Sequence, residues 1–133
     1  MSEMYTDRLL DHYRHPRNRG RLPRRPDTCG LVFGAEEYNP LCGDRVRIEF
    51  RVQDGRVTEA FFDGRGCAVC LGAASILTEV IYGKSLEELC GLGRSQFLAE
   101  LQSSIRPSRL KCALLPWVAF RRAAYGENET GEE

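Results

Sequence analysis

Residues 45–63 read RVRIEFRVQDGRVTEAFFD, and this stretch decides the fold. Every second residue from Val46 to Val52 is apolar and those between are charged or polar, which is the period of a strand with one buried face. Asp54-Gly55 supplies a two-residue turn into a second strand over residues 56–63, so the stretch predicts an antiparallel hairpin. A weaker run over residues 31–35 predicts a third strand and a small three-stranded meander.

Helical signals flank this hairpin. The small and aliphatic residues 67–82 predict a buried helix that Gly83 terminates. Ser85, followed three residues later by Glu88, predicts a capping box that opens a short helix. The other expected helices cover residues 4–14 (ended by Pro16), residues 94–102, and a last segment from about Cys112 with Pro116 in its first turn. These elements predict a single α+β domain, an antiparallel sheet with helices packed on one face.

The composition is that of an ordinary globular domain. The 133 residues carry 19 Lys and Arg against 19 Asp and Glu, so net charge singles out neither nucleic acid nor an anionic membrane as a ligand. No apolar run approaches the roughly 20 residues that span a bilayer, and residues 1–8 lack the apolar core of a secretory signal. We expect a cytoplasmic protein with a folded domain over residues 1–126 and an acidic, disordered tail over residues 127–133.

Seven arginines between Arg8 and Arg25 are the main local bias of charge. They can form a solvated helix face and loop, or a patch that docks an acidic partner or nucleic acid. Aromatic residues of the kind that stack on bases are sparse among them, which favours the solvated interpretation. We therefore expect no sequence-specific nucleic-acid binding.

Three of the six cysteines share a distinctive context. Cys42 lies in a turn, NPLCGD at residues 39–44, that leads into the alternating strand, whereas Cys67 and Cys112 stand where helices are expected to begin. Unpaired N–H groups at a helix N-terminus favour the thiolate, the form that binds metals and attacks sulfur. Three sulfurs and the carboxylate of Asp44 would make four donors, the number in a tetrahedral zinc or iron site.

The motif DHYRHPRNRG at residues 11–20 resembles the N-terminal signature of the IscU, SufU and NifU N-terminal scaffold family. Three later motifs agree in order and spacing. Residues 39–44 resemble the first ligand loop of that family, Gly66-Cys67 resembles the second, and residues 110–112 (Leu-Lys-Cys) resemble the third. The resemblance covers residues 5–124, and a match of four motifs in the same order argues against coincidence.

This resemblance implies a site and a role. It implies that Cys42, Asp44, Cys67 and Cys112 are the ligands, with Cys42 as the first candidate to accept sulfur and Cys112 as the alternative. The implied role is a non-catalytic scaffold that takes sulfur from a cysteine desulfurase, binds iron, and passes a transient [2Fe-2S] cluster to apo-proteins. The alternative is a SufU-like zinc-dependent sulfur-transfer protein that uses the same site, and zinc is the metal expected in the isolated protein.

Two departures from the family pattern leave this choice open. IscU-like members carry His at the position of Lys111, so this lysine makes the chain resemble SufU. Residues 92–111, however, are too short for the segment that SufU-like chains insert there. Lys111 can keep neighbouring thiols ionised, or it can be a solvated side chain. Residues 105–109 replace the Leu-Pro-Pro-Val-Lys segment by which IscU is recognised by its dedicated Hsp70 chaperone, so we do not carry that partner over.

The remaining cysteines and histidines have structural interpretations. Cys70 would complete a Cys-x-x-Cys motif with Cys67, but no second such motif exists, and a buried small side chain is expected there, as for Cys29 and Cys90. His12 and His15 are expected to be structural residues of a helix end. A zinc hydrolase or deaminase is disfavoured, because no His-x-Glu element precedes a Pro-Cys-x-x-Cys motif.

Overall fold

The core of the fold is a three-stranded antiparallel sheet with strand order β1-β2-β3. In the computed structural model, which describes residues 6–23 and 30–126, the strands are β1 (Leu31–Asn39), β2 (Asp44–Gln53) and β3 (Arg56–Arg65). The predicted hairpin between β2 and β3 is confirmed. Asp54 and Gly55 in its turn both have positive φ angles, 52° and 79°, as a primed two-residue turn requires.

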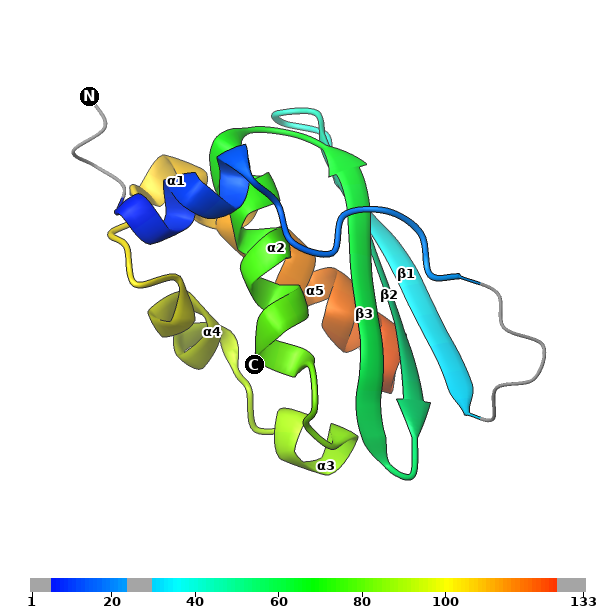
Figure 1. Cartoon of the computed structure of the whole chain (residues 1–133). Helices are drawn as coiled ribbons and strands as arrows, with labels where there is room; N and C mark the ends of the chain where they lie inside the picture. The colour runs from blue at the N-terminus through cyan, green and yellow to red at the C-terminus, as the bar shows by residue number, and fades with distance from the viewer. Residues whose placement is uncertain (1–5, 24–29, 127–133) are drawn as a thin grey trace.

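Five helices accompany this sheet in the described part of the chain: α1 (Asp7–Arg14), α2 (Ala68–Ile81), α3 (Leu86–Leu89), α4 (Arg94–Leu101) and α5 (Leu110–Tyr125). The two long helices pack on one face of the sheet, α2 mainly over β3 and α5 over β1 and β2 (Figure 1). This arrangement confirms the predicted α+β class. None of these described helices is long and apolar enough to cross a membrane.

The alternation along β2 directs one row of side chains into the core. Val46, Ile48 and Phe50 are fully buried beneath the two long helices. Phe33 of β1 stacks on Phe50, with ring centroids 5.2 Å apart. β1 is longer than the strand predicted over residues 31–35, because its pairing with β2 continues to Asn39. Burying Val46, Ile48 and Phe50 contributes about 1.5–3 kcal/mol each to folding.

The beginning of α5 differs from the prediction. The helix begins at Leu110, directly after a 3-10 turn at Pro107–Arg109, so Cys112 is its third residue. Pro116 therefore lies inside the helix, not in its first turn, and the prediction was wrong on this point. Proline has no N–H to donate to the carbonyl of Cys112, four residues earlier. α5 packs against the sheet and α2, and Pro116 is buried in this packing.

The segment after α1 crosses the free edge of β3 and reaches the outer face of the sheet (Figure 1). Phe62 donates its N–H to the Asn18 carbonyl at 3.0 Å and accepts the N–H of Gly20 at 2.7 Å. Further along, the Leu22 N–H donates to the Glu49 carboxylate at 2.8 Å. The N-terminal segment is therefore held against the edge and the outer face of the sheet without being one of its strands.

Glu49 is buried on this outer face between two guanidinium groups. Arg47 donates to its carboxylate at 2.7 Å and Arg21 at 3.2 Å. Burial by itself raises the pKa of Glu49, but the Leu22 N–H and the two arginines lower it to about 2. The carboxylate is therefore charged at neutral pH and holds the N-terminal segment onto the sheet.

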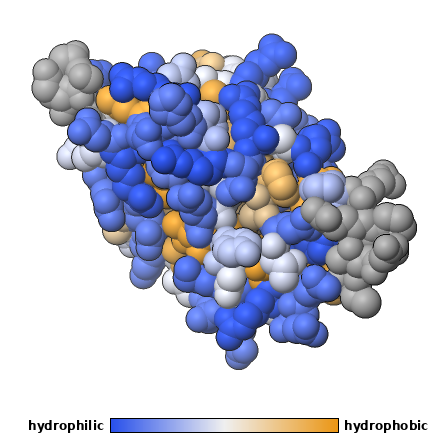
Figure 2. All heavy atoms as spheres, in the orientation of Figure 1, coloured by the Kyte–Doolittle hydropathy of each residue, from blue (hydrophilic) through white to orange (hydrophobic). Residues whose placement is uncertain are grey.

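Several members of the arginine run make intramolecular ion pairs. Arg17 pairs with Asp11, and Arg21 pairs with Glu49. Figure 2 shows hydrophilic side chains over most of the face that is seen in Figure 1. These pairs agree with the expected solvated helix face and loop. Residues 24–29, with Arg24, Arg25 and Cys29, lie outside the described residues, as does the predicted tail at 127–133.

His12 joins α1 to α2 from a buried position. Its Nδ1 lies 2.7 Å from Ser75 Oγ, which also accepts the N–H of Arg17 at 2.9 Å. Burial, helped by the charge of Arg17, lowers the pKa of His12 from its ordinary value. His12 is therefore a structural residue, as predicted, and His15 caps the C-terminal end of α1.

Candidate metal centre

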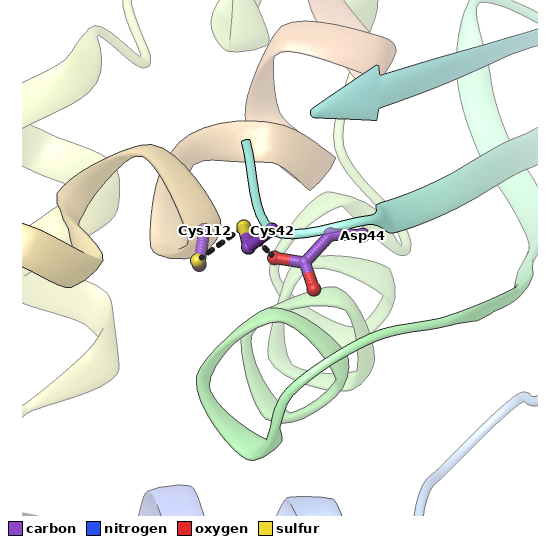
Figure 3. Close-up of side chains that lie close together, drawn as sticks. All are labelled: Cys42, Asp44 and Cys112. Carbon is purple, nitrogen blue, oxygen red and sulfur yellow. Dashed lines mark hydrogen bonds between the residues drawn. The ribbon is translucent and has the colours of Figure 1, made fainter. Parts of the chain in front are cut away.

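Two cysteines and one aspartate meet at the end of the sheet where β1 turns into β2. Cys42 lies in this turn, Asp44 is the first residue of β2, and Cys112 is in the first turn of α5. Cys42 Sγ lies 3.4 Å from Cys112 Sγ and donates to Asp44 Oδ2 at 3.2 Å (Figure 3). All three donor atoms lie within 4.8 Å of one another. The fold thus brings Cys112 to Cys42 and Asp44, which lie 70 and 68 positions earlier in the chain.

The turn that carries Cys42 is held by Asn39. The Asn39 side chain accepts the N–H of Leu41 at 3.1 Å and donates from Nδ2 to Cys42 Sγ at 3.1 Å. Gly43, with φ of 76°, closes the turn by donating its N–H to the Asn39 carbonyl at 2.8 Å. Cys42 itself is exposed, and Leu41 beside it is 83% exposed. The turn therefore presents this thiol at the surface next to an exposed apolar side chain.

Cys67 approaches the cluster through its backbone. Its N–H donates to Asp44 Oδ1 at 3.1 Å, and its Sγ lies 3.9 Å from Asp44 Oδ2. The thiol is outside the group of three donors that lie within 4.8 Å of one another. Cys67 is the N-cap residue of α2, as predicted, but the structure places it beside the compact cluster, and its role as the fourth ligand remains a prediction.

Gly66 allows the Asp44 carboxylate to lie against this helix end. A Cβ atom at position 66 would lie 2.6 Å from Asp44 Oδ1 and 3.2 Å from Asp44 Cβ. Both distances are shorter than ordinary contacts, so a side chain at position 66 would displace the carboxylate. The supporting roles of Asn39 and Gly66 were not predicted from the sequence, although both residues lie within the ligand motifs.

Cys112 is buried, which alters its acidity. Burial raises the pKa of its thiol, and the adjacent Asp44 and Cys42 raise it further, although Arg109 acts in the opposite direction. The expectation that its place near a helix N-terminus favours the thiolate of Cys112 is therefore not met, because burial and the adjacent Asp44 and Cys42 raise the pKa of this thiol. A metal that binds this sulfur must displace its proton.

Lys111 is next to Cys112 in the chain, but it lines a groove that the clustered donors do not line. It is exposed and lines a groove of about 410 Å³ with Arg94, Tyr38 and Leu114. None of the three clustered donors lines this groove. The placement supports the interpretation of Lys111 as a solvated side chain.

The other two described cysteines differ from each other. Cys70 is fully buried, as predicted, and burial raises the pKa of its thiol. Cys90, predicted to be a buried small side chain, is exposed at the C-terminal end of the short helix α3. That prediction was wrong, because Cys90 is the C-cap residue of a four-residue helix whose buried side chain is that of Leu89.

Comparison with known proteins identifies the family of this chain. The model of the NifU-like N terminal domain matches residues 4–129. The chain belongs to this family. Among relatives of this NifU-like domain, the scaffold protein IscU of Haemophilus influenzae is 34% identical over 121 residues, which cover 90% of this chain and 91% of that protein.

A relative of a second type is similar over nearly the whole chain. The zinc-dependent sulfurtransferase SufU of Bacillus subtilis is 29% identical over 144 residues, which cover 96% of this chain and 93% of that protein. The crystal structure of FiSufU from Fervidobacterium islandicum AW-1 shares the fold, with a TM-score of 0.75 at 21% identity over 92% of this chain and 97% of that one. Identity at this level does not separate the IscU and SufU types.

The NifU-like donor set fits a tetrahedral metal ion. With metal–sulfur bonds of about 2.3 Å, two thiolate ligands lie roughly 3.8 Å apart. The 3.4 Å between Cys42 and Cys112 needs only a small opening to reach that separation. Cysteine sulfur with one carboxylate oxygen suits zinc or iron, and magnesium or calcium would require more oxygen donors.

Proposed function

We propose that this protein accepts sulfur from a cysteine desulfurase and assembles a transient [2Fe-2S] cluster that it passes to apo-proteins. The observation that carries this proposal is the convergence of Cys42, Asp44 and Cys112 within 4.8 Å at the surface end of the sheet. Membership of the family that includes IscU and SufU supports it. The cluster is cargo here, and the protein is proposed as a carrier and not as an enzyme of its own.

Cys42 is proposed as the residue that receives sulfur. Its thiol is exposed on a turn, whereas Cys112 is buried, so an incoming persulfide can reach Cys42 first. The Cys42 thiolate attacks the outer sulfur of the desulfurase persulfide, a new S–S bond forms on Cys42, and the desulfurase cysteine leaves as a thiolate. Cys112, 3.4 Å away, is the alternative acceptor.

The proposed ligand set is Cys42, Asp44, Cys67 and Cys112. Three members are in place, and the Cys67 thiol is close enough to join by a side-chain rotation, since its Sγ lies 3.9 Å from Asp44 Oδ2. When zinc is bound, it would keep the thiols deprotonated and away from oxidants. We expect about one zinc per chain after aerobic purification.

A second candidate function is zinc-dependent sulfur transfer without cluster assembly. It is favoured by Lys111, which cannot serve as a neutral ligand as a histidine could. The relative from Bacillus subtilis, a zinc-dependent sulfurtransferase, supports this candidate. The cytosol is the proposed compartment of either function, together with a desulfurase partner.

One experiment separates these candidates. The protein is incubated without oxygen with cysteine, ferrous iron and a desulfurase, persulfide is located by mass spectrometry, and cluster absorbance is followed after a chelator is added. We expect persulfide on Cys42 and a short-lived cluster that Lys111→His stabilises. Cys90→Ser is the matched control, because Cys90 is an exposed thiol remote from the ligand motifs.

Two outcomes would contradict the proposal. Persulfide found only on Cys70 or Cys90 would exclude Cys42 as acceptor. Persulfide on Cys42 without any cluster, in both the wild type and Lys111→His, would reject the scaffold function in favour of sulfur transfer.

A further inference from the structure

A second thiol lies behind Cys67 at the beginning of α2. Cys67 is the N-cap residue of this helix and Cys70 is its third residue. Cys67 is half-buried, whereas Cys70 is completely buried. The proposed function uses Cys67 as a ligand and gives Cys70 no role, so the pair needs a separate explanation.

The placement of the pair is that of a dithiol which can close to a disulfide. Cys-x-x-Cys motifs at a helix N-terminus, with the first cysteine accessible and the second shielded, are the usual framework of reversible dithiol chemistry. Here the motif follows a strand, β3, and opens a helix. Residues three apart on a helix hold their Cβ atoms about 5–6 Å apart, and a disulfide needs roughly 3.5–4.5 Å.

The end of the helix can supply this small approach. Cys67 has an extended backbone, φ −75° and ψ 171°, and its side chain makes no capping hydrogen bond. Its Sγ has only a long contact, 3.9 Å, with Asp44 Oδ2. The Cys67 carbonyl accepts the N–H of Leu71 at 3.0 Å, so a shift of this N-cap residue toward Cys70 loosens at most one hydrogen bond of α2.

We propose that Cys67 and Cys70 form a reversible disulfide that withdraws Cys67 from the metal centre. The Cys67 thiolate attacks a small-molecule disulfide such as oxidised glutathione, giving a mixed disulfide and one free thiolate. The Cys70 thiol then loses its proton and attacks the Cys67 sulfur of this mixed disulfide, which releases the second glutathione as a thiol. Two cysteine thiols are oxidised and one small-molecule disulfide is reduced to two thiols.

The order of attack follows from accessibility. Cys67 can be reached from the solvent, whereas Cys70 cannot, so only Cys67 can meet the oxidant. The disulfide leaves at most Cys42, Asp44 and Cys112 as donors. The consequence for metal binding rests on the proposed function, because it requires Cys67 to be a ligand, whereas formation of the disulfide itself does not.

Peptide mapping tests the disulfide directly. The zinc-free wild-type protein is treated with oxidised glutathione, alkylated and digested with trypsin. Cleavage after Arg65 and Lys84 gives a peptide, residues 66–84, that contains Cys67 and Cys70 and no other cysteine. We expect this peptide to be lighter by two hydrogens and not alkylated, and to be alkylated twice after reduction with dithiothreitol.

Competing reactions give different products. A disulfide between Cys42 and Cys112, whose sulfurs are in contact, would join two separate tryptic peptides. That cross-link with peptide 66–84 fully alkylated, or a glutathione adduct that persists on Cys67, would overturn the proposal. The wild-type result does not depend on any variant being stable.

Zinc measurements test the link to the metal centre. Zinc affinity is measured by chelator competition before and after oxidation, in the wild type and in Cys70→Ala, with Cys70→Val as a second variant should the alanine fail to fold. We expect oxidation to weaken zinc binding at least tenfold in the wild type, and reduced Cys70→Ala to bind zinc as the wild type does. If the disulfide forms without any loss of zinc affinity, the proposed reaction between Cys67 and Cys70 stands, but Cys67 is not a zinc ligand. Scaffold activity can fail without affecting either readout.

Discussion

Replacing Gly66 by alanine tests whether the position of the Asp44 carboxylate determines metal binding. The backbone at Gly66 does not have a left-handed conformation, so alanine adds steric contact without torsional strain. Its Cβ would lie 2.6 Å from Asp44 Oδ1, 3.0 Å from Cγ and 3.2 Å from Cβ. The whole Asp44 side chain must move, because the close contacts include atoms near its backbone.

The magnitude follows from the hydrogen bond that this movement breaks. The Cys67 N–H donates to Asp44 Oδ1 at 3.1 Å, and hydrogen bonds to charged groups contribute about 1.5–3 kcal/mol. At about 1.4 kcal/mol for each factor of ten, zinc affinity should fall roughly 10- to 100-fold. Chelator competition measures the affinity, and urea denaturation of the apo-protein confirms that the fold persists.

A matched control separates this steric effect from a general effect of alanine. Gly91→Ala places its Cβ 3.7 Å from the Glu88 carbonyl, an ordinary contact, and should leave zinc affinity unchanged. If Gly66→Ala bound zinc as tightly as the wild type, then either Asp44 is not a ligand or its position does not matter.

Three further predictions concern the fold. The pKa of His12 is lower in the folded protein than its ordinary value of 6.5, so the unfolded chain binds more protons and the free energy of unfolding should decrease as the pH falls through 6.5. His12→Gln should make the free energy of unfolding, measured by urea titration, depend less on pH across that range. An unchanged pH dependence would contradict the burial argument. Glu49→Gln should lower the free energy of unfolding by about 1.5–3 kcal/mol at neutral pH. Because the pKa of Glu49 in the folded protein is about 2, below the ordinary 4.5, the difference in stability between the wild type and the variant should shrink as the pH falls below 4.5, and an equal difference at pH 7 and about pH 3 would refute this. Phe50→Ala should cost about 3–5 kcal/mol in thermal or urea unfolding, since the ring is fully buried and stacked on Phe33, and a cost below about 1 kcal/mol would show that the core can collapse into the space.

Local patterns were enough to predict the sheet and most helices. The alternation from Val46 to Val52 and the Asp54-Gly55 turn defined the hairpin, because both signals are contained in the stretch itself. β1 was predicted too short, since Gly34 and the consecutive Glu36 and Glu37 interrupt its alternation. Its full length depends on pairing with β2, which no local pattern records.

The candidate site was predicted as a set of residues but not as a geometry. Sequence motifs identified Cys42, Asp44 and Cys112, and the structure brings these three together. The raised pKa of Cys112 could not be predicted, because it depends on how deeply α5 is packed. The contact between Gly66 and Asp44 likewise joins chain segments 22 residues apart. Sequence motifs predict which residues form a site, whereas the burial of those residues and the contacts between them are known only from the folded structure.

The segment from Asn18 to Gly20 also protects the protein from self-association. A bare edge strand offers unpaired N–H and C=O groups to any other extended chain, and such edges nucleate aggregation. Phe62, near the middle of β3, has both of its backbone groups occupied by this segment. A newly made or truncated chain without this covering would expose an aromatic-rich strand to its neighbours. We therefore expect loss of this segment to promote edge-to-edge association of β3 in addition to loosening the fold.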